Sequence, residues 1–508
     1  MVPIVRVIPG TVRKVCQLTG ERDRESGEFT ASKTETNYGL FGTDLGSSFE
    51  HGGRLWFLFG DTWPSPEDRP VFDTDSVAWT IATEASRSLT LTFVSEQGND
   101  GRTRYTSPVV TDAAGAQLRT GAFEVPIAGF STQDQMYVFY SLDAAAENGG
   151  PGGLDAFWIG QDGSVVTALA NPNIDKARWQ PASGLTPQGA TRADSALAAV
   201  TRFEGALDVF WIGPDGAVAT TWANPQVDNA NWHPPFPITP PGTASANSPI
   251  AADTRVNGGS SMIMGRTVLT RAIGNDPTDL LALYDMSRSA DDGRFINVAL
   301  AKAQGDAAGL PIGGEVLLAW GSGRYRASNP YFAYIPLGQV ENPAAWNFFA
   351  GFADLPTMTQ PLWSSDQREA SPLFVQPQIG ELSASWIAPL GIWLMLYNAG
   401  NPHGINGRVS SSPWGPWSDP IVVFDPGAPG LGYGHFMHVK DAADGLADVG
   451  REGEWGGEYG PYIIDRFTRD GGVDEYGNHL CQLCFVMSTW NPYNTVLITV
   501  GLQRDRAG

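Results

Sequence analysis

The sequence predicts an all-β protein of the propeller type. Short segments rich in aromatic and β-branched residues recur along the 508 residues, and Gly, Pro, Asp or Asn bounds most of them. No segment longer than two or three helical turns shows the 3.6-residue period of an amphipathic helix. Strands at this spacing without crossover helices are typical of sandwiches, barrels and propellers.

The clearest predicted strands share this pattern and lie at residues 54–62, 135–143, 207–213, 279–287, 315–323, 392–400 and 495–502. The first of them, RLWFLFGDT, is nearly all apolar before it reaches a Gly-Asp pair. Such a run between turn residues predicts a strand.

One internal repeat lies in the first half of the chain. LDAFWIGQDGSVVTALANPNIDKARW runs from Leu154 to Trp179, and LDVFWIGPDGAVATTWANPQVDNANW follows 53 residues later, from Leu207 to Trp232. A third, partial start lies at residues 238–256. A period near 50 residues with tryptophan-containing strands indicates propeller blades.

The repeat is similar to the blades of bacterial fucose-binding β-propeller lectins, which carry a comparable LDVFW-x-G-x-DG signature. The resemblance covers about residues 144–258. Those lectins need many blades to close a ring, whereas only about two are present here, so this pair must pack on the rest of the chain or on another copy of it. Its role stays open between a second carbohydrate-binding surface, a homo-oligomer contact and a purely structural subdomain.

The repeat interrupts a larger unit. VFYSLD (138–143) precedes it and SMIMGRTVLTR (261–271) follows it, and without the repeat these two segments would be neighbouring strands of one sheet. We therefore expect residues 144–258 to be an insertion into a catalytic propeller formed by residues 1–143 and 259–508.

Charge and composition exclude several partners. The net charge is -22 and the isoelectric point is near 4.6, so neither nucleic acid nor an anionic membrane surface is an expected partner. No window of 18 apolar residues occurs, and no signal peptide is visible, although a signal removed before the numbering starts would leave the same N-terminus. No metal triad, phosphate loop or G-x-S-x-G elbow is found, so no metal or cofactor is expected.

The three cysteines predict no disulfide and no zinc site. Cys481 and Cys484 lie in HLCQLCFVMST, which predicts a strand and therefore opposite directions for the two side chains. Cys16 is the remaining cysteine, and no second pair exists to complete a tetrahedral site. A buried structural role is expected.

The most informative stretch is residues 36–63, which predicts a hairpin around Gly52-Gly53. Asp44 lies seven residues before His51, and Asp61 lies seven residues after Arg54. An unbroken ladder would therefore set the two aspartates opposite each other, with Cβ atoms about 4.5–5.5 Å apart. Gly42, Gly46 and Gly60 flank the pair and would permit bulges and the close approach of a substrate.

Two facing carboxylates have a chemical use. Like charges raise one of the two pKa values, so that one group keeps a proton near neutral pH. Glycoside hydrolysis needs this combination of a protonated acid and an ionised carboxylate. An aspartate directly after a strand is also a common turn residue, so a structural role is the competing interpretation.

Polar and aromatic residues that suit a polyhydroxylated ligand gather at other predicted strand ends. Neutral donors, arginine forks and aromatic faces are the groups that such a ligand needs. The candidate substrate-binding residues are Trp63, Glu124, Arg324, Tyr325, Asn398, His403, Asn406, Arg408, His435, Glu458, Tyr459, Trp490 and Asn491.

Several segments together resemble one family, the bacterial endo-D-arabinanases, glycoside hydrolases of actinobacteria long catalogued as a domain of unknown function. The segments are YGLFGTDLG with WFLFGDTW, MGRTVLTR, FINVAL, WGSGRYRAS-x-PY, GINGR with PWGPWSDP, GYGHFMH, and GGEYGPY with MSTWNPY. The resemblance implies a five-bladed β-propeller and, as substrate, the D-arabinan of mycobacterial-type arabinogalactan and lipoarabinomannan. It also implies that Asp44 and Asp61 are the acid/base pair.

The resulting hypothesis is an endo-acting glycosidase, secreted or at the cell surface, with a cytoplasmic location left open. Asp61, at the exit of an apolar strand, is expected to be the general acid, and Asp44 the base that activates water with inversion. A carboxyl separation of about 5–5.5 Å would instead make Asp44 a nucleophile, with retention. A non-catalytic lectin and an exo-acting furanosidase are the alternatives.

Overall fold

The protein is built almost entirely from β-strands. The computed structural model describes residues 2–65, 74–98, 100–118, 124–142, 154–170, 181–191, 195–201, 207–223, 231–245, 248, 250, 265–288, 293–354 and 357–506. Within these ranges the one α-helix, α1 (Thr34–Tyr38), has five residues. The short 3-10 helices are η6 (Leu337–Gln339), η7 (Pro343–Ala345), η8 (Gln367–Glu369), η9 (Ala388–Leu390) and η10 (Asp465–Phe467). The predicted all-β class is confirmed.

The chain divides into two compact units. The first unit comprises Met1–Asp143 and Met262–Gly508, and the second unit comprises Ala144–Ser261. The expected boundaries at residues 143/144 and 258/259 lie outside the described residues. The predicted pairing across the gap is confirmed, because β11 (Gln135–Leu142) pairs with β19 (Arg266–Ile273), with Leu142 opposite Arg266.

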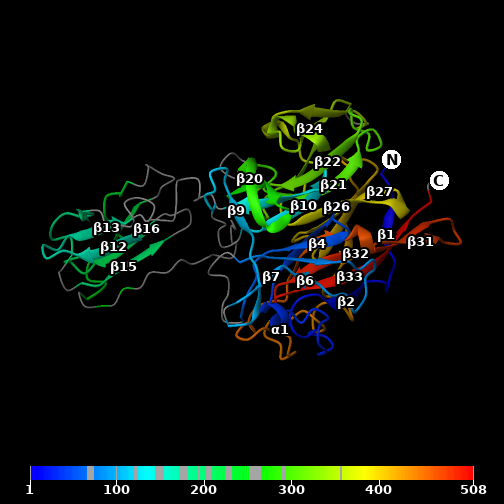
Figure 1. The fold of residues 1–508 in the computed structure, drawn as a ribbon. Coiled ribbons are helices and arrows are strands. Elements are labelled where there is room, and N and C mark those ends of the chain that lie inside the picture. Colours follow the sequence, from blue (N-terminus) through cyan, green and yellow to red (C-terminus); the bar gives the residue numbers. More distant parts are fainter. Residues whose placement is uncertain are drawn as a thin grey trace. The chain divides into compact units, whose positions relative to one another are not determined.

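Five sheets of four or more strands make up the described part of the first unit (Figure 1). Sheet I contains β3 (Leu45–His51), β4 (Arg54–Phe59), β5 (Ser76–Thr80) and β6 (Thr92–Phe93). Sheet II contains β10 (Pro126–Thr132), β11, β19, β20 (Asp276–Arg288) and β9 (Val109–Thr111). Sheet III contains β21 (Asn297–Gln304), β22 (Glu315–Ser322), β23 (Pro330–Pro336), β24 (Asn347–Phe352) and β25 (Pro361–Ser364).

The remaining two sheets bring the ends of the chain together. Sheet IV contains β26 (Leu382–Ile387), β27 (Ile392–Asn398), β28 (Ile405–Ser410) and β29 (Ile421–Phe424). Sheet V contains β30 (Glu458–Ile463), β31 (Arg469–Val473), β32 (His479–Thr489), β33 (Asn494–Arg504), β1 (Val5–Val7) and β2 (Arg13–Gln17). The blue N-terminal strands therefore share a sheet with the red β33 (Figure 1). A separate hairpin joins β7 (Ser95–Gln97) to β8 (Thr103–Tyr105).

One edge strand from each of the five sheets takes part in a cycle of contacts. β3 contacts β10, β10 contacts β21, β21 contacts β26, β26 contacts β30, and β30 contacts β3. Neighbouring sheets also share apolar cores, as Trp320 of sheet III and Trp393 of sheet IV do, with ring centroids 5.4 Å apart. Burying such a side chain contributes about 1.5–3 kcal/mol. A five-bladed propeller stays a prediction, and this cyclic order fits it.

The cysteines lie as predicted. Cys16, Cys481 and Cys484 are buried and free. Cys481 packs in the core between sheets IV and V, whereas Cys484 packs in the core that joins sheet V to sheets I, II and III. The two side chains of β32 therefore serve different cores, because alternate residues of a strand point to opposite faces.

The second unit repeats its strands at the period found in the sequence. One sheet contains β12 (Leu154–Ile159), β13 (Val165–Ala170) and β14 (Ser183–Gly184), and the other contains β15 (Leu197–Thr201), β16 (Leu207–Ile212), β17 (Val218–Ala223) and β18 (Phe236–Pro237). The two repeats share one core around Val165, Val209 and Trp211. Trp232 packs against this core, whereas its counterpart Trp179 lies outside the described residues.

Candidate active site

The β3–β4 hairpin differs from its prediction at one position. Its register runs as expected from His51 opposite Arg54 to Ser47 opposite Leu58, and it shifts by one residue between Ser47 and Leu45. The N–H of Gly60 then donates to the carbonyl of Asp44 at 3.1 Å. The expectation that Asp44 and Asp61 are directly opposed in an unbroken ladder is therefore wrong, because a β-bulge intervenes.

The bulge is a strained piece of backbone next to Asp44. Gly46 has φ +104°, and Leu45 has φ +62°, a left-handed conformation that is costly for a leucine. The Leu45 N–H donates to Ser488 Oγ at 2.7 Å, which anchors the bulge on β32. A Cβ on Gly60 would lie 2.6 Å from Asp44 Oδ1, so Asp44 needs glycine at position 60.

Asp44 is a buried carboxyl with one hydrogen-bond donor. Tyr459 Oη donates to Asp44 Oδ2 at 2.8 Å, while Asp44 Oδ1 accepts no hydrogen bond from the described residues. Burial raises the pKa of Asp44 to about 7, the hydrogen bond from Tyr459 opposes this rise, and the charge of Glu381 adds to it. A carboxyl with this pKa can give up or take up a proton near neutral pH.

Asp61 follows β4 and is half-buried. Burial raises its pKa well above the usual range, and the charges of Asp44, Asp75 and Glu124 raise it further. Asp75 is buried directly before β5 and accepts a hydrogen bond from Tyr140, while Glu124 is buried two residues before β10. Asp61 thus shares one electrostatic environment with three other carboxyls, whose charges oppose its ionisation.

Glu381, whose charge raises the pKa of Asp44, is buried and has two side-chain neighbours. Tyr325 Oη donates to Glu381 Oε1 at 2.7 Å, and Arg326 Nη2 lies 3.9 Å from Glu381 Oε2. The pKa values of Tyr459, Tyr462 and Tyr493 are all raised, first by burial and then by nearby carboxylates that include Asp44. These tyrosines stay protonated at neutral pH.

Sequence reasoning missed Glu381, although a signal for it exists. An acidic residue stands at, or one or two residues before, four of the five strands in the cycle β3, β10, β21, β26, β30. These residues are Asp44 before β3, Glu124 before β10, Glu381 before β26 and Glu458 at the start of β30. The fifth strand of the cycle, β21, begins with the buried Asn297 instead.

An open pocket of about 650 Å³ borders this group. Its lining residues are Arg326, Gln378, Asn398, Ala399, Gly400, His403, Tyr433, Trp455, Gly457 and Glu458. Asn398, His403 and Glu458 had been predicted, whereas Trp455 had not, although this tryptophan is 51% exposed and packs on Tyr433 with ring centroids 5.1 Å apart. An exposed aromatic face beside amide, carboxyl and guanidinium groups suits a sugar.

Glu458 has two basic neighbours in this pocket. His403 Nε2 lies 3.7 Å from Glu458 Oε1. Burial raises the pKa of the Glu458 carboxyl, and the neighbouring His403 and Arg326 oppose the rise. Arg326 also faces Glu381, so one guanidinium connects the pocket to the carboxyls around Asp44.

Four other predicted binding residues are buried and bonded within the protein. Trp63 stacks on Tyr493 at 4.0 Å, Asn406 donates to the carbonyls of Pro402 and Gly404, Arg408 donates to Tyr397 and Ser418, and Asn491 donates to the carbonyl of Arg451. These residues support the walls of the site. A buried residue with such partners cannot be told from an exposed one by its sequence motif.

Of the remaining predicted residues, some lie at the surface and others donate a hydrogen bond to a carboxyl group. Trp490 is 39% exposed, and its indole N–H donates to Glu454 Oε2. Arg324 and His435 are exposed and make no side-chain hydrogen bond or ion pair with the described residues. Tyr325 and Tyr459, predicted to bind substrate, instead donate to Glu381 and Asp44.

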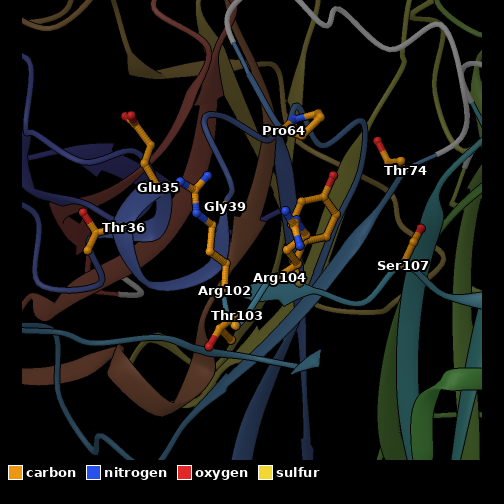
Figure 2. Close-up of a pocket in the computed structure, with 11 residues that line it drawn as sticks. Glu35, Thr36, Gly39, Pro64, Thr74, Arg102, Thr103, Arg104 and Ser107 are labelled. Atoms are coloured by element: carbon orange, nitrogen blue, oxygen red, sulfur yellow. The ribbon is translucent and has the colours of Figure 1, made fainter. Parts of the chain in front are cut away.

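A second pocket of about 850 Å³ lies beside α1 and the β7–β8 hairpin (Figure 2). Figure 2 shows Glu35 and Thr36 of α1 on one side and Thr74 and Ser107 on the other. Thr74 Oγ1 and Tyr105 Oη both donate to the carbonyl of Thr62, the residue after Asp61. Hydrogen bonds therefore join these two residues of the pocket wall to the end of the hairpin that carries Asp61.

The described residues contain no group of three or more His, Cys, Asp or Glu side chains arranged to hold a metal ion. Nor does any described helix have the length and apolar character needed to span a membrane.

Comparisons with known proteins give one family match. The model of a domain of unknown function (DUF4185) matches residues 275–499. The search of curated protein sequences finds no match. Residues 275–499 cover sheets III and IV and most of sheet V, and they include Glu381 and Glu458 but neither Asp44 nor Asp61.

Solved structures match only distantly. A protein of unknown function from Dyadobacter fermentans is 11% identical, covers 98% of this chain and 100% of its own, and has a TM-score of 0.30. A glycosyl hydrolase from Bacteroides ovatus is 10% identical, with 83% and 97% covered and a TM-score of 0.21. The catalytic domain of a GH62 α-L-arabinofuranosidase from Coprinopsis cinerea is 10% identical, with 98% of each chain covered and a TM-score of 0.21. At TM-scores this low, the similarities carry no argument about function.

Proposed function

We propose that this chain is a glycoside hydrolase that cleaves internal D-arabinofuranosyl linkages of arabinogalactan-type polymers on a five-bladed β-propeller. One observation carries the proposal: Asp44 and Asp61 flank the same end of one hairpin, and burial raises the pKa of both carboxyls. A pair of carboxyls of which one keeps its proton near neutral pH is what acid/base cleavage of a glycoside requires.

In the proposed chemistry one carboxyl gives up a proton and the other takes one up. Asp61 donates its proton to the glycosidic oxygen as the bond from that oxygen to the anomeric carbon breaks. Asp44 takes a proton from water, and the water oxygen bonds to the same carbon from the opposite face. The product is a sugar of inverted configuration, and the two carboxyls exchange protons with solvent to restore the starting state.

The substrate class rests on the sequence resemblance and on the pocket beside Arg326. Trp455 and Tyr433 offer aromatic surface, while Gln378, Asn398 and His403 offer hydrogen-bonding groups. A polymer of this kind lies outside the cytoplasm, so we propose a secreted or cell-surface enzyme. For the five-bladed propeller, the support is the cyclic order of β3, β10, β21, β26 and β30 and the pairing of β1 and β2 with β33.

The test is incubation of the purified chain with arabinogalactan and assay of new reducing ends. General acid and base groups each contribute about 10²–10⁴-fold, so Asp44→Asn and Asp61→Asn should each reduce the rate by at least about 100-fold. Asp474→Asn is the matched control, because Asp474 lies in an exposed turn and hydrogen-bonds to Asn478. Reducing-end release that survives both active-site changes would exclude the proposed pair.

A non-catalytic carbohydrate-binding protein is the second candidate. The observation that favours it is the pair of repeated sheets in the second unit, which resemble lectin blades and share one core. Binding of arabinogalactan without any product, unchanged by Asp44→Asn and Asp61→Asn, would establish this alternative. The size distribution of products distinguishes endo from exo action.

A further inference from the structure

Two exposed tryptophans, Trp455 and Trp490, adjoin the same pair of glycines, Gly456-Gly457. Trp455 is 51% exposed and Trp490 is 39% exposed. The backbone N–H of Trp490 donates to the carbonyls of Gly456 and Gly457 at 2.7 and 2.8 Å, and Trp455 directly precedes the pair in the chain. Single exposed apolar side chains are common, but two exposed indoles fixed on one pair of glycines indicate a binding surface.

The glycine pair packs tightly on the segments around it. A Cβ on Gly456 would lie 2.8 Å from the backbone nitrogen of His438, and a Cβ on Gly457 would lie 3.2 Å from Trp490 Cβ. The N–H of Gly456 also donates to the carbonyl of His438 at 2.8 Å. The segment that carries Trp455 is therefore held against the segment that carries Trp490.

Side chains fix the orientation of the Trp490 ring. Its Nε1–H donates to Glu454 Oε2 at 2.8 Å, and Arg451 Nη2 donates to the same oxygen at 2.8 Å. The Arg451 guanidinium lies over the Trp490 ring at 4.6 Å from its centroid, and the ring of Tyr493 packs on it at 5.8 Å with an interplanar angle of 88°. A ring held by three neighbours loses little freedom when a ligand stacks on its exposed part.

Trp490 is connected to the Asp61 end of the β3–β4 hairpin. Trp63, two residues after Asp61, stacks on Tyr493 with ring centroids 4.0 Å apart, and the Arg451 guanidinium lies 5.3 Å from the centroid of the Trp63 ring. Arg451 and Tyr493 both pack on Trp490 as well. One layer of packed side chains therefore joins the segment after Asp61 to the exposed indole of Trp490.

Trp455 is connected to Asp44 along its own segment of chain. Trp455 and Glu458 line the open pocket of about 650 Å³, and Tyr459, the next residue, donates to Asp44 Oδ2 at 2.8 Å. An aromatic wall beside a few polar groups is the usual lining of a pocket that orients a small polar ligand. The two exposed indoles thus adjoin the surroundings of the two carboxyls of the proposed active site.

We propose that Trp455 and Trp490 are two stacking platforms of one extended binding site, each for a different sugar ring of the same furanoside chain. This inference rests on the proposed glycosidase function and names the residues that hold the polymer. Each indole face takes the apolar face of a sugar ring, while polar groups of the pocket hydrogen-bond its hydroxyls. Because the rings of one polymer are linked, a chain that covers both platforms binds more tightly than a chain that covers one.

The first experiment measures binding of a long D-arabinofuranosyl oligosaccharide, prepared from arabinogalactan, by calorimetry. The full chain carries Asp61→Asn, which stops cleavage. Trp455→Leu and Trp490→Leu keep an apolar side chain but remove the aromatic face, so each should weaken binding at least about tenfold. Trp490→Phe keeps an aromatic face and should stay within about threefold of the parent.

The second experiment measures hydrolysis by the chain with Asp61 restored. Trp455→Leu and Trp490→Leu should raise KM, and raise it more for long oligosaccharides than for short ones, while kcat stays within about threefold. A substitution that only disturbed the fold would change KM by the same factor for both lengths. Such a result, for either tryptophan, would overturn the inference.

Trp386→Leu is the matched control. Trp386 of β26 is 44% exposed and packs on Trp393 with ring centroids 5.5 Å apart, so it is an equally exposed indole supported by an aromatic neighbour. Its replacement should leave binding and KM unchanged. If Trp455→Leu or Trp490→Leu binds the oligosaccharide as tightly as Trp386→Leu does, the inference is overturned and the proposed function stands. A chain that hydrolyses no arabinan, but whose binding depends on both tryptophans, would refute the proposed function alone.

Discussion

At the scale of single residues, the site depends on a carboxyl whose ordinary pKa is 3.8 and whose pKa in the fold is about 7. Burial is the largest cause of the rise, and the hydrogen bond from Tyr459 does not cancel it. The folded state therefore binds a proton that the unfolded state has already lost between these two pH values. By linkage, the free energy of unfolding must fall as the pH rises through this window.

This fall is measurable by urea unfolding. Over about three pKa units, one such group lowers the free energy of unfolding by up to about 4 kcal/mol. Asp44→Asn should flatten the dependence of stability on pH between pH 4 and pH 7. Asp474→Asn should leave it unchanged, because Asp474 is an exposed turn residue whose pKa is lowered, so it titrates below this window. An identical slope in wild type and Asp44→Asn would show that Asp44 is ionised throughout.

Gly60 provides a second test at this scale. A methyl group there would meet Asp44 Oδ1 at 2.6 Å, Val125 Cγ1 at 2.8 Å and Leu45 Cδ1 at 2.9 Å. Gly60→Ala should therefore displace the carboxyl, reduce kcat at least about tenfold and destabilise the fold by about 1–3 kcal/mol. Gly338→Ala is the control, since a Cβ at Gly338 meets nothing within 4 Å. Full activity in Gly60→Ala would mean that the Asp44 carboxyl tolerates displacement.

At the scale of elements, the loop between β29 and β30 is held by a buried histidine. Nδ1 of His438 lies 2.7 Å from Asp444 Oδ1, and Nε2 lies 2.9 Å from the carbonyl of Glu452. Both neighbours are acceptors, so both ring nitrogens donate when the imidazole is charged. Burial opposes this charge, but the two hydrogen bonds outweigh it and raise the pKa of His438 above its ordinary 6.5.

The contribution of His438 to the free energy of unfolding decreases as the pH rises. A histidine with a raised pKa stabilises the fold fully below its unfolded pKa, and this contribution is lost as the pH rises through the folded pKa. His438→Gln should therefore cost about 1–3 kcal/mol at pH 5.5 and less at pH 9, by urea unfolding. His435→Gln is the control, because His435 is exposed in the same loop. A cost that is equal at both pH values would exclude a charged His438.

The apolar runs of the sequence predict where strands lie more accurately than they predict where strands end. The apolar runs predicted at 315–323 and 392–400 contain β22 and β27, and the run predicted at 495–502 lies within β33. The run predicted at 54–62 ends as β4 at Phe59, since the ladder is broken at Gly60. A bulge needs only one glycine with positive φ, and the hairpin register alone gives no sign of which glycine will take it.

At the scale of the whole molecule, the pairing of Leu142 with Arg266 makes a deletion testable. Opposed residues of an antiparallel pair lie about 5 Å apart, so a short Gly/Ser linker can replace residues 144–264 without moving β11 or β19. Loop length costs little, so the first unit should keep its unfolding free energy to within about 1 kcal/mol and should still hydrolyse arabinan oligosaccharides. Loss of cooperative unfolding would show that the second unit is needed for the fold.

Linear sequence determined the all-β class, the 53-residue repeat, the pairing across that repeat and the opposite faces of Cys481 and Cys484, because each depends on local alternation, turn residues or a simple period. Asp44 and Asp61 were identified from one hairpin, although their direct opposition was not correct. Only the tertiary structure associated Glu381 with Asp44 and exposed Trp455 while burying Trp63, Arg408 and Asn491. Contacts between sheets join residues hundreds of positions apart, and burial, which sets both the pKa values and the accessible side chains, exists only after those sheets pack.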